Sequence, residues 1–234
     1  MNFINNIKFL LKFLGYSSKE FSPCKIYQIE QLKNIKVEKK SIEFGTYNYD
    51  ESFTKFIRPD SNKNFFSNIK NLKTKNYIKF NLEKKNNLNK KFDNIIIFNV
   101  LEHIHNDLKA IQELKKILNK NGKLIISTPF IYRYHEAPED YKRYTASYFE
   151  RLLKEMNFKI IKSKYLGEGP FIASYSLFFD YLKKIPFITY PIIILCYLFD
   201  KILSLFHKTS INKIYPICIL IIAKNKWIKN LKTI

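Results

Sequence analysis

The stretch FDNIIIFNVLEHIHNDLKAIQELKKILNKNGKLIISTPFIYRYHEAPEDYKRYT, residues 92–145, decides the fold. An apolar run over 95–100 is typical of a buried strand, and a second run over 123–128 ends at a proline. Between them, apolar residues recur at helical spacing until Asn121-Gly122, where we expect the helix to stop. Two strands that read as buried on both faces, joined by a helix, indicate a parallel sheet and an α/β fold.

Polar side chains follow both predicted strands directly. Glu102 and His103 come after the first strand, and a loop over 132–144 that is rich in tyrosine, arginine and histidine follows the second. In open α/β sheets, ligands bind outside the carboxyl ends of the strands. The sequence therefore predicts a binding site formed by these two segments.

Three motifs in this stretch carry a family resemblance: VLEH at 100–103, NGKLIISTPF at 121–130 and HEAPEDYKRYT at 135–145. The stretch resembles the second half of class I S-adenosylmethionine-dependent methyltransferases of the type 11/12-like kind. It is most similar to the branch associated with cell-surface polysaccharide or lipid modification, and the match spans about residues 76–160. The resemblance implies S-adenosylmethionine as cofactor. It also implies a Rossmann-like sheet of seven strands, mostly parallel with an antiparallel last strand, with helices on both faces.

The remaining elements follow from the apolar pattern. We expect strands over 40–45, 53–57, 77–80, 158–166 and 215–223, a helix over 1–14, a short helix within 62–71, and a helix after an N-cap at Thr145. Four segments result: an N-terminal helical cap (1–40), a methyltransferase core (41–166), an apolar helical insertion (167–212), and a last strand with a basic tail (213–234).

The insertion is unusually apolar, and two interpretations of it stay open. We expect two helices, near 171–184 and 190–207, because the apolar run over 185–199 is interrupted by Pro186 and Pro191 and is shorter than a membrane span. They pack on the sheet or on the twin subunit of a homodimer. Alternatively they lie in a membrane interface, where their lysines meet anionic head groups. The second interpretation predicts peripheral membrane contact through 171–207.

Composition bounds the partners and the compartment. The 234-residue chain carries a net charge of +21, but its lysines are scattered, so compositional bias explains the charge better than nucleic-acid binding does. Cys24, Cys196 and Cys218 are far apart and form no CxxC, so neither a disulfide framework nor a metal site is predicted. We expect a cytoplasmic protein, with peripheral placement on the inner face of the membrane.

The resemblance implies a set of cofactor-binding residues after the first four strands. Glu43 and Gly45 stand where the family has an acid-x-Gly-x-Gly turn, although Tyr47 replaces the second glycine. Asp60 follows at the spacing of the acid that binds the ribose hydroxyls. The full predicted set is Glu43, Gly45, Asp60, Asn81, Leu82, Asn99 and Val100.

The Glu102-His103 pair and the polar loop supply the predicted catalytic and substrate-binding residues. Imidazole titrates close to neutral pH, so His103 and His135 are the predicted acid–base residues. The predicted substrate-binding residues are Glu102, Tyr132, Arg133, Tyr134 and Arg143, since guanidinium grips phosphate or carboxylate. In the alternative interpretation the loop is self-contained, and Asp140 pairs with Arg143.

The expected function is methyl transfer from S-adenosylmethionine to a hydroxyl, or an amine, of a small molecule, a sugar or a lipid-linked glycan. A non-catalytic scaffold or partner subunit with a degenerate cofactor turn is the alternative. Nucleic acid is not a predicted acceptor, because the Asn-Pro-Pro-Tyr-like tetrapeptide of amino-methylating DNA enzymes is replaced here by Asn99-Val100-Leu101-Glu102.

Overall fold

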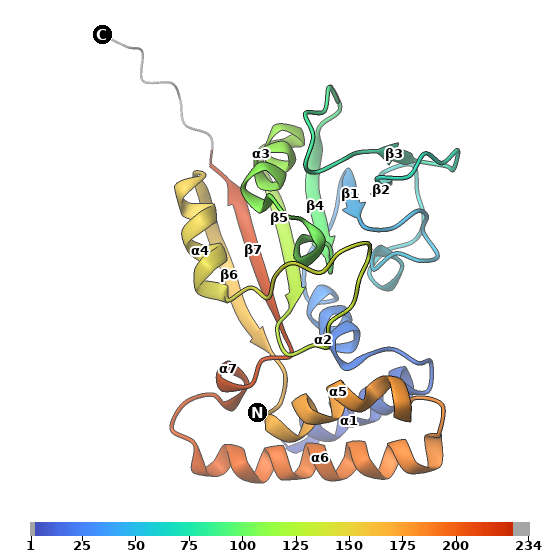
Figure 1. Cartoon of the computed structure of the whole chain (residues 1–234), viewed down its shortest axis with the longest axis vertical. Helices are drawn as coiled ribbons and strands as arrows, with labels where there is room; N and C mark the ends of the chain where they lie inside the picture. The colour runs from blue at the N-terminus through green and yellow to red at the C-terminus, as the bar shows by residue number, and fades with distance from the viewer. Residues whose placement is uncertain (1–2, 227–234) are drawn as a thin grey trace. The chain divides into compact units, whose positions relative to one another are not determined.

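The computed structural model describes residues 3–226. Within them, seven strands form one sheet in the order β3-β2-β1-β4-β5-β7-β6 (Figure 1). The strands are β1 (Ser41–Phe44), β2 (Asn64–Asn68), β3 (Tyr77–Lys79), β4 (Phe92–Phe98), β5 (Leu118–Pro129), β6 (Phe158–Leu166) and β7 (Cys218–Asn225).

The sheet is mostly parallel. Strand β1 pairs parallel with β2 and β4, β2 pairs parallel with β3, and β4 pairs parallel with β5. At one end of β7, Ile217 N donates to Leu166 O, and at the other Lys226 N donates to Asn157 O. Partner numbers that fall as β7 advances mean that β7 runs antiparallel to β6. The predicted fold class is confirmed.

Local sequence explains the strand–helix–strand unit. Ile95, Ile96 and Ile97 of β4 are buried, as expected for a strand covered on both faces. Helix α3 (Asp107–Ile117) starts where the Asn106 side chain accepts a hydrogen bond from Lys109 N, and α4 (Ala146–Glu155) starts where the Thr145 side chain accepts from Tyr148 N. The N-cap predicted at Thr145 is confirmed.

Two predictions about the first half of the chain are wrong. The expected strand over 53–57 is a short 3-10 helix, η1 (Thr54–Phe56), and the expected helix within 62–71 is strand β2. The buried Glu43 carboxylate accepts hydrogen bonds from the backbone of Phe53 and Thr54, which bends that segment into a turn. Strand β2 is fixed by its pairing with both β1 and β3, which local propensity does not encode.

The predicted end of the helix after β4 is also wrong. Helix α3 ends at Ile117, and β5 begins with the next residue. The register of β4 and β5 jumps from Phe92 opposite Leu118 to Asn94 opposite Lys123. Asn121, with φ +62°, lies in this irregularity, so the Asn-Gly pair shapes a bulge within the strand instead of a helix cap.

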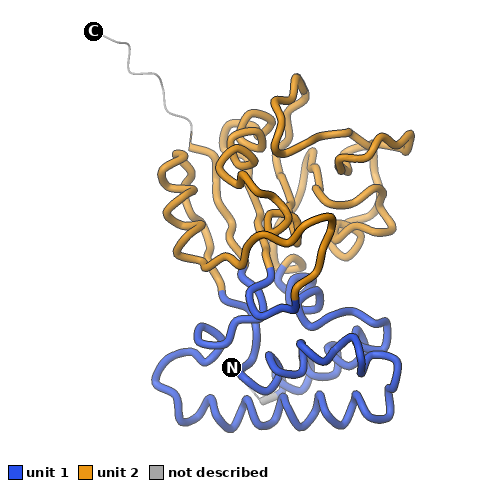
Figure 2. The backbone as a smooth tube through the Cα atoms, viewed as in Figure 1, with its two compact units in different colours: residues 1–31, 129–133, 165–219 blue, residues 32–128, 134–164, 220–234 orange. Residues whose placement is uncertain are grey.

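The chain forms two compact units (Figure 2). Unit 1 contains residues 1–31, 129–133 and 165–219, and unit 2 contains residues 32–128, 134–164 and 220–234. The predicted basic tail beyond residue 226 lies outside the described residues. The helices carried largely or wholly by unit 1 are α1 (Phe3–Ser17), α2 (Pro23–Leu32), α5 (Pro170–Leu182), α6 (Pro186–Phe206) and α7 (Ile211–Ile214).

The two predicted helices of the insertion are α5 and α6, although α6 begins at Pro186 and continues through Pro191. Within unit 1, α6 packs against α5 and α1. Asp200 of α6 is buried, and its carboxylate accepts hydrogen bonds from Phe171 N and Ile172 N at the start of α5, each at 2.9 Å. An acid at a helix N-terminus satisfies otherwise unpaired N–H groups, so this contact ties the helices together.

Candidate functional site

A cavity of about 630 Å³ lies within unit 2, at the carboxyl ends of the parallel strands. Its wall includes Gly45 after β1, Asn68 at the end of β2, Asn81 after β3, and Asn99 and Val100 after β4. This volume falls in the range of small-molecule sites, roughly 300–1,000 Å³. Four strands therefore contribute to one cavity, as the topology of an open α/β sheet requires.

Gly45 is held in a conformation that favours glycine. Its φ is +88°, and a Cβ built on it would lie 2.5 Å from Val100 Cγ2. Backbone of the turn after β1 therefore lies against the end of β4 and forms part of the cavity wall. Tyr47, which replaces the second glycine of the family turn, also lines the cavity. The turn thus keeps an open cavity despite the substitution.

Glu43 is placed differently from the prediction. Its carboxylate is buried and accepts hydrogen bonds from Phe53 N at 2.7 Å, Thr54 N at 2.9 Å and Thr54 Oγ1 at 2.6 Å. It is not part of the cavity wall. Glu43 therefore holds the segment after β1 in place, and a direct contact with cofactor stays a prediction.

Asp60 also lies outside the cavity wall. Asp60 is predicted because it follows the expected strand over 53–57. That strand is a 3-10 helix in the structure, so Asp60 does not follow the end of a strand. Instead it is partly exposed, with Oδ2 3.7 Å from Lys75 Nζ. The position at the end of β2 belongs to Asn68, whose side-chain oxygen accepts a hydrogen bond from Ile69 N. An amide stands where the resemblance places an acid.

The loop after β3 carries Asn81 and Leu82 to the cavity wall. Asn86 closes this loop, because its side-chain oxygen accepts from Asn81 N and its amide donates to Asn81 O. Asn86 N in turn donates to Glu113 Oε2 of α3 at 3.1 Å. Lys116 holds the same carboxylate, with a Nζ–Oε1 distance of 2.7 Å. A helix thus anchors the loop that presents Asn81.

We expect the contacts of Glu113 to make the free energy of unfolding depend on pH in the acid range. Hydrogen bonds and the nearby lysines outweigh burial and lower the pKa of Glu113 from 4.5 to about 2. A folded-state pKa below the unfolded one gives stability that is present above about pH 4.5 and is lost as pH falls towards 2. Glu113→Gln should cost about 1–2 kcal/mol at pH 7 and flatten this acid limb. Urea unfolding at pH 7, 5 and 3 measures the free energy of unfolding, with the exposed Glu155→Gln as control. If that free energy fell equally with pH in Glu113→Gln and in wild type, the anchoring role of Glu113 would be wrong.

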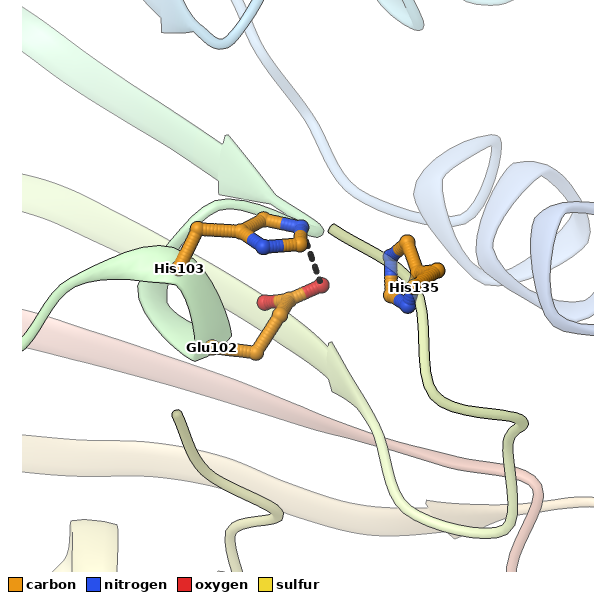
Figure 3. Close-up of side chains that lie close together, drawn as sticks. All are labelled: Glu102, His103 and His135. Atoms are coloured by element: carbon orange, nitrogen blue, oxygen red, sulfur yellow. Dashed lines mark ion pairs between the residues drawn. The ribbon is translucent and has the colours of Figure 1, made fainter. Parts of the chain in front are cut away.

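Glu102, His103 and His135 form a cluster at the end of β4 (Figure 3). One ligand-type atom from each of the three side chains lies within 4.8 Å of the other two. Glu102 Oε1 is 3.9 Å from His103 Nε2, and the two imidazole rings meet edge to face with centroids 4.8 Å apart. His103 lines the cavity, so the cluster adjoins it. The structure thus brings both predicted acid–base residues together.

Several hydrogen bonds dock the loop after β5 onto the turn after β4. Tyr141 N donates to Glu102 O at 2.8 Å, and the buried Tyr144 hydroxyl donates to Leu101 O at 3.0 Å. Another joins His103 Nδ1 to Glu139 O at 2.6 Å. The HEAPEDYKRYT motif therefore positions His135 beside the VLEH motif.

Burial dominates the chemistry of Glu102. Its side chain is 0% exposed, and burial raises its pKa from 4.5 to about 8, although the Arg143 guanidinium opposes this. Neither carboxyl oxygen has a hydrogen-bond partner on another described residue. A buried carboxyl without partners is costly when ionised, so such a group needs a proton or a cation nearby.

The predicted substrate-binding residues of the loop are divided between the two units. Tyr132 and Arg133 belong to unit 1, where Arg133 Nε lies 2.5 Å from Asp180 Oδ2. Tyr134 is 64% exposed, and its hydroxyl donates to Glu136. Arg143 donates from both terminal nitrogens to Asp140, so the self-contained interpretation holds for this pair.

Sequence reasoning missed several residues of the cavity wall. They are Phe44, Tyr47, Ser67, Asn68, Ile69, Lys70, Phe80, Glu83, Ile104, Ala137, Pro138, Glu139 and Tyr141. The signal for Asn68 was present, because the apolar pair Phe65-Phe66 followed by polar residues reads as a short strand and its end. The contribution of 137–141 depends on how the loop docks, which the sequence pattern does not give.

Comparison with known proteins agrees with this geometry. Residues 25–163 match the family described as "Methyltransferase domain". The chain belongs to this methyltransferase family. The predicted resemblance, enzyme class and cofactor are thereby confirmed, while the polysaccharide- and lipid-modifying branch stays a prediction. The family match covers the cavity and the whole Glu102–His103–His135 cluster.

A curated relative of this methyltransferase is the tRNA U34 carboxymethyltransferase of Campylobacter fetus subsp. fetus, 36% identical over 104 residues. The match covers 43% of the chain and 33% of the relative, so the chain spans about a third of the relative's length. Among solved structures, an S-adenosylmethionine-dependent methyltransferase from Mesorhizobium loti aligns with TM-score 0.54 at 10% identity, covering 86% of this chain and 98% of that one. A structure from Haloferax volcanii, a complex of the Trm112 methyltransferase activator and a putative methyltransferase, aligns with TM-score 0.53 at 9% identity, covering 86% and 89%. At these identities the structures support the fold.

Proposed function

We propose that the chain transfers a methyl group from S-adenosylmethionine to a hydroxyl of a small molecule, a sugar or a lipid-linked glycan, with an amine as second choice. One observation carries the proposal: a carboxyl and two imidazoles adjoin a cavity that the ends of four parallel strands form. Bound S-adenosylmethionine supplies an activated methyl group on a sulfonium, whose carbon–sulfur electron pair stays on sulfur. The protein then has to align the acceptor and take its proton.

The residues in the cavity support these tasks. Gly45 gives the cofactor close access to backbone, while Asn68 and Asn81 offer amides to its polar groups. His103 reaches the cavity and is the residue we assign to the acceptor proton. A hydroxyl acceptor needs such a base more than an amine does, because an amine already carries a nucleophilic lone pair.

A nucleic-acid acceptor is the second candidate. Two observations favour it: the relative that acts on tRNA by its name, and the net charge of +21. Binding through scattered lysines would be strongly salt-dependent. The Haloferax neighbour, a complex with an activator protein, suggests a protein partner as a further alternative to the homodimer.

Calorimetric titration with S-adenosylhomocysteine tests the cofactor site. We expect micromolar binding, weakened about fivefold by Asn81→Ala, which removes one hydrogen bond worth roughly 1 kcal/mol. Asn87→Ala, on the exposed part of the same loop, is the matched control and should bind like wild type. Absence of binding by a folded, cooperatively unfolding protein would exclude the enzyme and favour the non-catalytic scaffold.

Acceptor classes are separated by methyl transfer from isotope-labelled S-adenosylmethionine. The assay offers hydroxyl-bearing sugars, lipid-linked glycans and unmodified tRNA in parallel, with the product identified by mass spectrometry. Label in a methyl ether of a sugar supports the first proposal. Label in tRNA, lost at high salt, would overturn it in favour of the second candidate.

For localisation we propose a cytoplasmic protein that contacts the inner face of the membrane through α5 and α6. By length and composition alone, α6 among the described residues could cross a bilayer, which is weak evidence for a span. Between 181 and 217 the only acid is the buried Asp200, whereas the segment holds five lysines. The exposed apolar side chains there include Phe178, Tyr181, Phe187, Leu198, Leu205 and Phe206. Sedimentation with anionic but not neutral vesicles would support this placement.

A further inference from the structure

One carboxylate oxygen of Glu102 and one imidazole nitrogen from each of His103 and His135 lie within 4.8 Å of one another (Figure 3). Two histidines and one carboxylate are a donor set that holds first-row transition metals and leaves further coordination positions open. The turn after β4 and the loop after β5 carry them, so the site exists only when both motifs are docked. The cysteine pattern, on which the prediction of no metal rested, does not bear on this donor set.

The hydrogen bond of His103 fixes which of its nitrogens faces the cluster. A backbone carbonyl can only accept, so the contact with Glu139 O places the ring proton on Nδ1. In the neutral ring, Nε2 then carries a lone pair and faces Glu102 Oε1 at 3.9 Å. A metal-binding histidine usually donates its other ring N–H to a carbonyl or carboxylate, as His103 does.

The surroundings of Glu102 support a bound cation independently of the donor set. Its carboxylate is fully buried, both oxygens lack a hydrogen-bond partner on other described residues, and one is aimed at the imidazole lone pair. An ionised carboxylate and an imidazole lone pair that face one another repel, so either a proton or a metal ion belongs between them. Asp140 positions His135, since its Oδ2 accepts a hydrogen bond from His135 N at 2.8 Å and lies 3.4 Å from His135 Nδ1.

We infer that Glu102, His103 and His135 bind a single divalent transition-metal ion at the edge of the cavity. The two imidazoles favour Mn²⁺, Fe²⁺, Co²⁺ or Zn²⁺ over Mg²⁺ and Ca²⁺, which prefer oxygen ligands. Donors bound at about 2.1 Å lie roughly 3–3.5 Å apart, so the cluster contracts by about 1 Å on loading. Three protein ligands leave room for water or substrate.

The role of the ion rests on the proposed function, whereas its binding does not. An acceptor hydroxyl that coordinates to the ion loses its proton more readily, because the positive charge stabilises the alkoxide. The acceptor class that fits is an alcohol with a second oxygen nearby, such as a vicinal diol of a sugar, which can occupy two open positions. With the ion bound, His103 would be a metal ligand, and water would take the acceptor proton in its place.

The test uses full-length protein without a polyhistidine tag, stripped with a chelator and titrated with Co²⁺. We expect one Co²⁺ per chain by calorimetry, with a visible absorption band that reports nitrogen and oxygen ligands. His103→Gln and His135→Gln should each weaken binding by more than about 100-fold, exceeding the usual effect of an outer-shell change. Glu102→Gln keeps the shape, removes the charge and should weaken binding similarly.

His105→Gln is the matched control, because His105 is exposed, lies two residues from His103 and is outside the cluster. Its variant should bind Co²⁺ like wild type. S-adenosylhomocysteine is titrated into the same samples. Binding of S-adenosylhomocysteine without Co²⁺ binding, or Co²⁺ binding that the three variants leave unchanged, would overturn the metal site and leave the proposed function standing. Co²⁺ binding without S-adenosylhomocysteine binding would support the site and count against the function.

Discussion

Gly45→Val should abolish detectable binding of S-adenosylhomocysteine, a loss of at least about 100-fold. A β-branched residue at φ +88° costs roughly 1–3 kcal/mol, and its Cβ would overlap Val100 Cγ2 at 2.5 Å. The turn can relieve the backbone strain and the overlap with Val100 only by moving. Because the turn is part of the cavity wall, that movement changes the cavity. Because each 1.4 kcal/mol is tenfold in affinity, strain and displacement together reach this loss. Calorimetry measures it, with urea unfolding to show that the variant is folded.

Two further variants separate the causes. Gly15→Ala is the matched control, since a Cβ there meets nothing within 4 Å, and it should bind like wild type. Gly45→Ala combined with Val100→Ala removes the overlap but keeps the backbone strain. It should recover part of the affinity lost in Gly45→Ala alone. Wild-type affinity in Gly45→Ala would show that the cofactor does not use this turn.

Glu43→Ala should lower the free energy of unfolding by about 3 kcal/mol. The substitution removes one buried carboxylate and leaves two backbone N–H groups and the Thr54 hydroxyl without their acceptor. Cofactor affinity should fall as well, although the carboxylate is outside the cavity wall, because the segment after β1 loses its anchor. Urea unfolding gives the stability change, and titration with S-adenosylhomocysteine gives the affinity.

Glu38→Ala serves as the control for Glu43→Ala. Glu38 is exposed and its ion pair with Lys36 spans 3.7 Å at the surface, so the change should stay within about 0.5 kcal/mol. Glu43→Gln should be intermediate, since one oxygen still accepts. A direct cofactor contact makes the opposite prediction: lost affinity at unchanged stability in both Glu43 variants. That outcome would return Glu43 to the cofactor site.

The sequence by itself determined the features that depend on neighbours along the chain. The strand–helix–strand unit, the N-cap at Thr145, strand β6 and the two insertion helices follow from apolar periodicity and local hydrogen bonds, which act over a few residues. The motif that ends in Thr145 also pointed to the family, now confirmed by the match over 25–163. Gly45, Asn81 and Asn99 were correctly expected near one another, because the ends of parallel strands meet at one edge.

Tertiary structure alone decided the rest. Strand β2 exists because β1 and β3 pair with it, whereas the apolar segment at 53–57 forms a turn because the Glu43 carboxylate binds its backbone. The polar residue at the end of the second strand is consequently Asn68 and not Asp60. The meeting of His103 with His135 likewise depends on a loop that docks through Tyr141 and Tyr144 onto the turn after β4. The physical reason is common to all three: the deciding partners are distant in sequence, so their pairing energy appears only when the sheet has assembled.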